Sequence, residues 1–153
     1  THLGGEDFTN ALCAACEKDF LEKQSSSSLK KKTTLDARSR RRLWQECDRV
    51  KRALSTAPSA RVEVDALADG VDYSKQVTRA DFERLCEPTF QRSMKSVDRV
   101  LKDAAVTKSA VDEVVLVGGS TRIPRVRQIL SDYFDGAKSL NQSVNADEAV
   151  AYG

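Results

Sequence analysis

The chain has 153 residues, of which 40% are hydrophobic and 31% are charged. This balance is typical of a folded globular protein, and it excludes wholesale disorder, a collagen-like repeat and a disulfide-rich miniprotein. The longest uninterrupted apolar stretch, Ala11–Cys16, is far shorter than the roughly 20 residues of a transmembrane helix. No signal peptide pattern opens the chain. Because the first residue is Thr1 and not Met, we expect a piece of a longer protein.

The formal net charge is only +2, but the charge is unevenly spread. Residues 30–52 contain ten Lys or Arg and three acidic residues. Such a segment attracts phosphates, acidic partners or nucleic acid, or it is the solvated face of a helix. Nucleic-acid binding is the weakest of these interpretations, because Trp44 is the only aromatic residue in the segment that could stack on a base.

The four cysteines, Cys13, Cys16, Cys47 and Cys86, do not complete a zinc site, because the sequence has a single histidine. Cys13 and Cys16 have CxxC spacing. On an amphipathic helix this spacing places them on adjacent turns, so we expect buried, structural thiols in a reducing compartment. Cys47 lies among three cationic residues, which would lower its pKa and make it reactive.

Apolar residues recur every three to four positions in two segments, which predicts two helices. The first follows Gly4-Gly5, and the second covers about 34–55. Ser25–Ser28 is expected to form a loop between them. The predicted apolar stripes are Phe8, Leu12, Ala15, Cys16 and Phe20 in the first helix and Leu43, Cys47, Val50 and Leu54 in the second.

Residues 61–77 have the alternating pattern of a β-hairpin, with Val62 and Val64 in its first strand. Asp69-Gly70 is the expected turn, because both positions tolerate positive φ. Thr78, with Asp81 three residues later, has the pattern of a helix N-terminus. The helix is expected to reach about residue 105, and Pro88 is expected to kink or split it.

Residues 111–153 indicate a small α/β unit. The β-branched run Val114–Val117 predicts a strand buried on both faces. A tight loop follows at Gly118-Gly119, and Pro124 suits the first turn of the next helix. The predicted buried face of that helix is Val126, Ile129, Leu130, Tyr133 and Phe134. The whole chain is therefore expected to be of mixed α/β class, with a helix-and-hairpin subdomain over 1–86 and an α/β unit over 87–153.

Two segments could bind a ligand. In the first, the strand ending at Val117 leads through Gly118 and Gly119 to a helix, where backbone amides attract anions and Arg122 could stack on a base or pair with a phosphate. The second is one face of the basic helix. Asp48, Lys51, Arg52 and Ser55 share this face by their spacing and could hold a ribose and a base, or form a surface ion-pair lattice.

Four segments, spread in order over the whole chain, carry a resemblance to a known family. They are residues 1–8 (THLGGEDF), 46–55 (ECDRVKRALS), 115–124 (VLVGGSTRIP) and 145–153 (NADEAVAYG). These segments resemble the heat shock protein 70 (DnaK-type) chaperone family. The resemblance implies the second lobe of the ATPase domain, within the actin-like, ribonuclease H-like fold. Residues 1–86 would correspond to subdomain IIB and residues 87–153 to part of subdomain IIA.

The resemblance also implies site residues for the adenosine part of ATP or ADP. The ribose and one side of the base would be held by Asp48, Lys51, Arg52 and Ser55. Along the ribose and phosphates would lie Gly118 and Gly119, and the adenine would be flanked by Ser120, Arg122 and Ile123. The phosphate path would be bordered by Gly4 and Gly5, and Asp147 would lie near the adenine pocket. Asp48 stands where the family usually has Glu, which shortens one arm of the ribose contact, and Ala146 stands where the family usually has Pro.

The implied function is that of an ATP-dependent chaperone of the heat shock response, in which the nucleotide state is coupled to protein folding. The family's other phosphate-binding loops and its catalytic lysine have no counterpart in the chain, so we expect Mg²⁺ and most phosphate contacts to come from the first lobe. The chain alone is then expected not to hydrolyse ATP. The alternative is an interaction module that docks nucleotide exchange factors. J-domain co-chaperones and unfolded clients would act through the intact, cytoplasmic protein.

Overall fold

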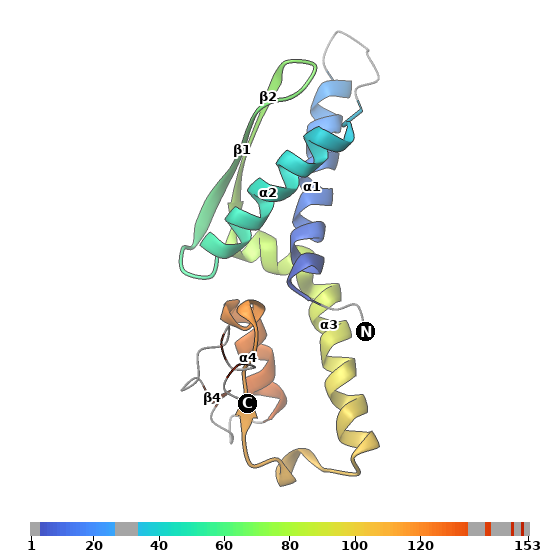
Figure 1. The fold of residues 1–153 in the computed structure, drawn as a ribbon, viewed down its shortest axis with the longest axis vertical. Helices are drawn as coiled ribbons and strands as arrows, with labels where there is room; N and C mark the ends of the chain where they lie inside the picture. Colours follow the sequence, from blue (N-terminus) through green and yellow to red (C-terminus); the bar gives the residue numbers. More distant parts are fainter. Residues whose placement is uncertain (1–3, 27–33, 135–139, 142–147, 149–150, 152–153) are drawn as a thin grey trace. The chain divides into compact units, whose positions relative to one another are not determined.

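The computed structural model describes residues 4–26, 34–134, 140–141, 148 and 151. The elements follow the predicted order, with two helices, a hairpin, a third helix, a short strand, a glycine loop and a fourth helix (Figure 1). The mixed α/β class is confirmed. The helices are α1 (Gly5–Ser25), α2 (Ala37–Ala53), α3 (Arg79–Asp103) and α4 (Pro124–Tyr133), with short 3-10 helices η1 (Lys108–Ala110) and η2 (Gly119–Arg122); the strands are β1 (Ser59–Ala68), β2 (Val71–Thr78), β3 (Val114–Val115) and β4 (Leu140–Asn141).

The chain forms two compact units, one made of Glu6–Glu87 and the other of Gly4, Gly5 and the residues from Pro88 onward. In the Glu6–Glu87 unit, α1 and α2 lie side by side with the hairpin next to them (Figure 1). Among the described residues, no helix is both long and apolar enough to cross a membrane.

The core of the Glu6–Glu87 unit is built from the predicted stripes. The second predicted stripe consists of Leu43, Cys47 and Val50 in α2 and Leu54 at its C-cap, and all four are at most 1% exposed. The aromatic residues Phe8 and Phe20 of α1 are also buried. Phe20 packs edge-on against Tyr73 of β2, with ring centroids 5.8 Å apart. Asp36 caps α2 by accepting a hydrogen bond from the Ser39 amide at 2.7 Å, a favourable N-terminal arrangement.

The hairpin turns at Asp69-Gly70, as predicted, with φ of 51° and 75° at the two positions. An irregularity between Val64 and Ala68, where Ala66 takes a φ of 43°, was not predicted. Asp72 stabilises this bulge, because its carboxylate accepts a hydrogen bond from the Ala66 amide at 2.6 Å. The predicted helix start is also confirmed, since the Asp81 amide donates to the Thr78 hydroxyl at 3.1 Å.

Pro88 does not split α3, which continues through it from Arg79 to Asp103. Proline removes one backbone donor and leaves the carbonyl of Arg84 without its usual partner. Both Pro88 and Arg84 are exposed, so water can satisfy that carbonyl, and the helix tolerates the proline.

The strand at Val114 is not buried on both faces, and that prediction was wrong. β3 contains only Val114 and Val115, and it pairs in parallel with β4. Leu116 is buried, but Val115 is 50% exposed and Val117 is 47% exposed. Within the described part of the chain β3 has no second neighbouring strand. One side of the β-branched run therefore faces outward.

α4 begins at Pro124, as predicted, but its expected buried face is only partly covered. Phe134, which caps its end, is buried, while the other four predicted residues are half-buried. Tyr133 contacts α3 through a hydrogen bond from its hydroxyl to Asp98, and the Lys108 ammonium lies 3.6 Å from the centre of its ring. The sequence also predicts that this helix stops at Asp135-Gly136 and that a last helix begins at Asp147. Both positions lie outside the described residues, although the Ala151 amide of the last segment donates to the Glu148 carbonyl at 2.8 Å.

Candidate functional site

Three of the four predicted residues on α2 form one charged cluster. The Asp48 carboxylate lies 2.6 Å from the Lys51 ammonium and 2.7 Å from the Arg52 guanidinium. The spacings of three and four residues place all three side chains on one helix face, as the sequence predicted. Ser55 follows in the turn after α2, where its amide donates to the Arg52 carbonyl at 3.2 Å.

Thr9 of α1 is a further member of this cluster that sequence reasoning missed. Its hydroxyl donates to Asp48 at 3.1 Å and accepts from the Lys51 ammonium at 2.9 Å. Thr9 is fully buried. The sequence feature that could have pointed to it is a residue with a hydroxyl group directly after Phe8 of the apolar stripe. The cluster therefore ties α1 to α2 and fixes the position of the carboxylate that holds Arg52.

The two cations of the cluster differ in exposure. The Lys51 side chain is only 14% exposed, and the Asp48 side chain 15%, whereas the Arg52 side chain is 77% exposed. Arg52 is thus held at one end by a partly buried carboxylate while most of its guanidinium faces outward. A guanidinium fixed in this way can stack on an aromatic ring, because stacking uses its flat face and the ion pair uses its edge.

Asp48 gives the cluster a defined pH dependence. Burial raises the pKa of this carboxyl, but hydrogen bonds from Lys51 and Thr9 and the charge of Arg52 outweigh burial and hold the pKa below its usual 3.8. A depressed carboxyl pKa stabilises the fold above the unfolded-state value, and this stabilisation is lost as the pH falls through the folded-state value.

We expect Asp48→Asn to lower the free energy of unfolding at pH 7 by about 1–2 kcal/mol, because it removes charge-assisted hydrogen bonds in a partly buried site. The deficit should shrink as the pH falls below 3.8, because the unfolded chain then binds a proton at Asp48 while the folded chain still holds the carboxylate ionised. Urea unfolding at pH 7 and pH 3 measures both values. Asp132→Asn, which changes an exposed carboxylate of α4, serves as the control. An Asp48→Asn deficit of equal size at the two pH values would contradict the assignment.

The second predicted site is built from β3, η2 and the start of α4. Gly118 has φ 92° and ψ 150°, a conformation that side chains strongly disfavour. The Thr121 hydroxyl and amide both donate to the Gly118 carbonyl, at 2.7 Å and 3.1 Å, and Arg127 closes the loop by donating to the Thr121 carbonyl at 2.7 Å. The glycine loop is therefore a fixed turn at the end of β3.

Replacing Gly118 by alanine is expected to cost about 1–2 kcal/mol of folding free energy, because the new Cβ opposes the positive φ. No atom lies within 4 Å of the place where that Cβ would go, so the cost comes from the backbone alone. Gly4→Ala is the matched control, since its Cβ also meets nothing within 4 Å and its φ is not in the positive range. Equal unfolding midpoints for the two variants would contradict this explanation.

The other predicted residues of this group differ in exposure. Gly119 and Arg122 are exposed and Ser120 is half-buried, whereas Ile123 is only 4% exposed. Gly4 and Gly5 stand at the beginning of α1. Asp147 lies outside the described residues. The structure thus brings the loop residues together in one unit and the α2 residues together in the other.

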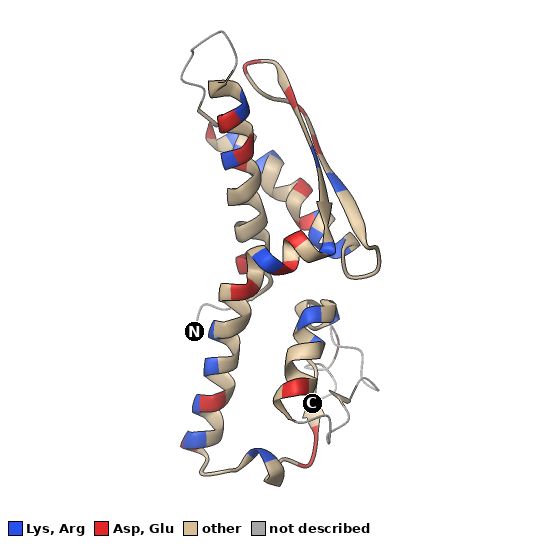
Figure 2. Cartoon of the chain, turned by 180° about the vertical axis from the view of Figure 1, so that it is seen from behind, with Lys and Arg blue, Asp and Glu red and all other residues tan. Residues whose placement is uncertain are grey.

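Most of the described Lys and Arg residues of the basic segment take part in ion pairs or backbone contacts, as in the ion-pair interpretation. Arg40 lies 2.9 Å from Glu17 of α1, and Arg49 lies 2.6 Å from Glu46. Arg49 also donates to the Arg61 carbonyl at 2.8 Å, and Arg42 donates to two carbonyls of β1. Acidic residues are interspersed with the basic ones on the helices (Figure 2). These arginines therefore hold α2 against α1 and the hairpin.

Cys47 does not have the reactive character that its cationic neighbours suggested. Its side chain is 0% exposed and lies in the core. Hydrogen bonding to Cys13 and Cys16, together with burial, raises the pKa of the Cys47 thiol. The neighbouring cations point to other partners, so they do not stabilise a thiolate at this position. All four cysteines are free and buried, as the structural interpretation predicted.

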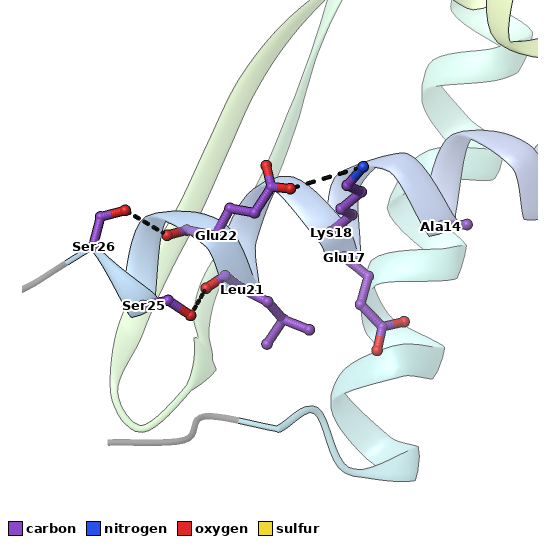
Figure 3. Close-up of a pocket in the computed structure, with 7 residues that line it drawn as sticks. All are labelled: Ala14, Glu17, Lys18, Leu21, Glu22, Ser25 and Ser26. Atoms are coloured by element: carbon purple, nitrogen blue, oxygen red, sulfur yellow. Dashed lines mark hydrogen bonds and ion pairs between the residues drawn. The ribbon is translucent and has the colours of Figure 1, made fainter. Parts of the chain in front are cut away.

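A hollow on the surface of α1 offers no better site. This hollow is lined by residues of that helix and its end alone (Figure 3). Its polar groups are already engaged, since Ser25 and Ser26 donate to the carbonyls of Leu21 and Glu22, and Lys18 pairs with Glu22. No group of His, Cys, Asp or Glu in the described part of the chain is arranged to hold a metal ion.

Comparison with known proteins decides the family. The model of the Hsp70 protein family matches residues 1–153. The chain belongs to the Hsp70 family. It is 53% identical over its whole length to a heat shock protein of Pyricularia oryzae, 50% identical to a heat shock 70 kDa protein of Neurospora crassa and 48% identical to heat shock cognate 70 kDa protein 3 of Dictyostelium discoideum. It covers 24%, 23% and 23% of these relatives, so this Hsp70 chain spans about a quarter of their length.

Proposed function

We propose that this Hsp70 chain is part of lobe II of an ATPase domain and that it binds the adenosine moiety of ATP or ADP with residues from both of its units. The observation that carries the proposal is the α2 cluster, in which Asp48 holds Arg52 while leaving 77% of its side chain exposed. Family membership over residues 1–153 supports the same assignment.

The α2 cluster suits a nucleoside. Arg52 offers a flat cation to the face of a purine. Asp48 and Lys51, each about one-seventh exposed, can exchange hydrogen bonds with ribose hydroxyls at the edge of the cluster. Ser55 adds a hydroxyl one turn further along. Asp48 has a shorter side chain than the glutamate usual in the family, so the ribose contact would be made closer to the helix.

The glycine loop suits the remainder of the nucleotide. Gly118 and Gly119 lack side chains, so a ribose or phosphate can approach the backbone closely. Ser120, Arg122 and Ile123 would flank the base. Gly4 and Gly5 would border the phosphate path, and Asp147 would lie near the adenine pocket. Mg²⁺ and the other phosphate contacts would come from lobe I, so the chain alone would not hydrolyse ATP.

In the intact protein, ATP turnover would be coupled to the folding of client polypeptides in the cytoplasm, with J-domain co-chaperones and nucleotide exchange factors as partners. Calorimetric titration of the 153-residue chain with ADP tests the binding step. We expect that ADP and adenosine each bind saturably and that inorganic phosphate does not bind. No heat of binding with ADP or adenosine would contradict the proposal.

A second candidate function is docking of nucleotide exchange factors by the hairpin. The observation that favours it is a rigid, exposed outer edge. Arg61, Glu63 and Ser74 of the hairpin are exposed, while Arg42 and Arg49 anchor β1 to α2 through its carbonyls. Substitutions over residues 61–77 should weaken docking and spare nucleotide binding. Arg52→Ala and Ser55→Ala should do the reverse, and loss of both functions by one variant would count against two separate sites.

A further inference from the structure

A buried hydroxyl group of α1 completes the α2 cluster. It belongs to Thr9, which is fully buried. The Thr9 hydroxyl donates to the Asp48 carboxylate at 3.1 Å and accepts from the Lys51 ammonium at 2.9 Å. Lys51 also donates to Asp48, at 2.6 Å. Three side chains from two helices therefore form a closed triangle of hydrogen bonds, which lies entirely within the Glu6–Glu87 unit.

The two oxygens of the Asp48 carboxylate are engaged unequally. Thr9 and Lys51 both donate to Oδ1, whereas the Arg52 guanidinium lies 2.7 Å from Oδ2. A carboxylate has about four acceptor positions, two on each oxygen. Contacts among the described residues therefore fill both positions on Oδ1 and one position on Oδ2. The remaining acceptor position is on the oxygen beside the exposed guanidinium.

Thr9 has the least conformational freedom of the residues that hold this carboxylate. Its β-branched side chain has a single torsion between heavy atoms, and the core encloses it. Lys51 and Arg52 have long side chains with several torsions each, and the Arg52 side chain is 77% exposed. The Thr9 hydroxyl therefore determines which oxygen of Asp48 is held by α1 and which oxygen is left beside Arg52.

We propose that Thr9 is a positioning residue of the nucleotide site, which holds Oδ1 of Asp48 so that Oδ2 accepts a ribose hydroxyl, and that the chain thereby selects nucleotides with ribose hydroxyls over those without them. The role assigned to Thr9 rests on the proposed function, in which Asp48 contacts the ribose. Thr9 acts through Asp48 and does not itself touch the nucleotide. Without the Thr9 hydroxyl, Asp48 can turn both oxygens toward Lys51 and Arg52, and its remaining acceptor position is no longer fixed.

The ribose hydroxyls are the only difference between ADP and 2′,3′-dideoxy-ADP, so a comparison of these two nucleotides isolates the contact with Asp48. A hydrogen bond to a charged group contributes about a factor of ten to binding. A site built to accept a hydroxyl also rejects an analogue that lacks it, because a polar group of the site then loses its partner. We expect the wild-type chain to bind ADP about tenfold more tightly than dideoxy-ADP.

The test is calorimetric titration of the 153-residue chain and its threonine variants with ADP and with dideoxy-ADP. Thr9→Val removes the hydroxyl and keeps the branched shape, and it should lower the preference for ADP to about twofold. Thr9→Ser keeps a hydroxyl and should keep the preference of the wild-type chain. Thr89→Val is the matched control, because Thr89 of α3 is 5% exposed and its hydroxyl accepts from Arg92. This control should also keep the preference.

The ratio of the two affinities separates positioning from a merely structural role, which would weaken both nucleotides by the same factor. An unchanged preference in a folded Thr9→Val chain would overturn the role of Thr9 and leave the proposed function intact. A wild-type chain that binds neither nucleotide would contradict the proposed function and the role of Thr9 together. If Thr9→Val does not fold, the NMR signal of the Thr9 hydroxyl proton in the wild-type chain decides. It should shift with ADP and not with dideoxy-ADP, and equal responses to both nucleotides would overturn the proposal.

Discussion

Leu43→Ala is expected to lower the free energy of unfolding by about 2–5 kcal/mol, because it removes a large buried side chain and leaves a cavity. Leu43 is 0% exposed, and it lies in the stripe of α2 that faces the core of the Glu6–Glu87 unit. A loss of this size is a large part of the stability of an ordinary domain. Urea unfolding followed by circular dichroism measures it.

Leu85→Ala is the matched control for Leu43→Ala. It makes the same chemical change on α3, at a side chain that is 38% exposed. Its cost should be at most about half that of Leu43→Ala, since much of the removed surface already contacts water. Equal costs for the two variants would show that the α2 stripe is not the centre of the core.

The double variant Arg52→Ala/Arg122→Ala is expected to weaken ADP binding about a hundredfold. Each arginine would contribute about a factor of ten, a typical value for a cation on the face of a base or beside a charged group. Each variant alone should weaken binding about tenfold. Calorimetric titration of the three variants with ADP gives the values.

Arg84→Ala is the control for the loss of a surface arginine. Arg84 lies 2.7 Å from Asp81 and is 78% exposed, so it matches Arg52 in its own exposure and in its distance from the paired carboxylate. Both single substitutions should leave stability nearly unchanged, because exposed ion pairs contribute little. Unchanged ADP affinity for Arg52→Ala, or an equal loss for Arg84→Ala, would exclude Arg52 from the site.

The sequence was sufficient to predict the helices and the hairpin, because each carries its own local signal. The apolar spacing of α2 predicted that Val50 and Leu54 are buried, and both are. The hairpin turn was predicted because Asp and Gly tolerate positive φ, and both Asp69 and Gly70 have positive φ. The contacts among Asp48, Lys51 and Arg52 follow from helical spacing alone. Local patterns of this kind do not depend on the rest of the fold.

Features that depend on packing between distant segments were not predicted. Thr9 joins the Asp48 cluster only because α1 packs on α2. The apolar spacing of α2 placed Cys47 in the core, but its cationic neighbours in the sequence suggested a lowered pKa, whereas two other thiols and burial raise that pKa. The run around Val115 has the composition of a doubly buried strand, but burial requires a partner on each side, and composition does not specify the partners. The bulge at Ala66 likewise depends on the Asp72 side chain across the hairpin.

The central claim is that one nucleoside contacts both the α2 cluster and the glycine loop. Titration of the isotope-labelled chain with ADP, followed by amide NMR spectra, tests it most directly. We expect the amide signals of Lys51–Ser55 and of Gly118–Arg122 to shift together with a single midpoint, while those of the hairpin turn at Asp69-Gly70 stay in place. Shifts confined to one of the two groups, or two groups that titrate with different midpoints, would contradict a shared site.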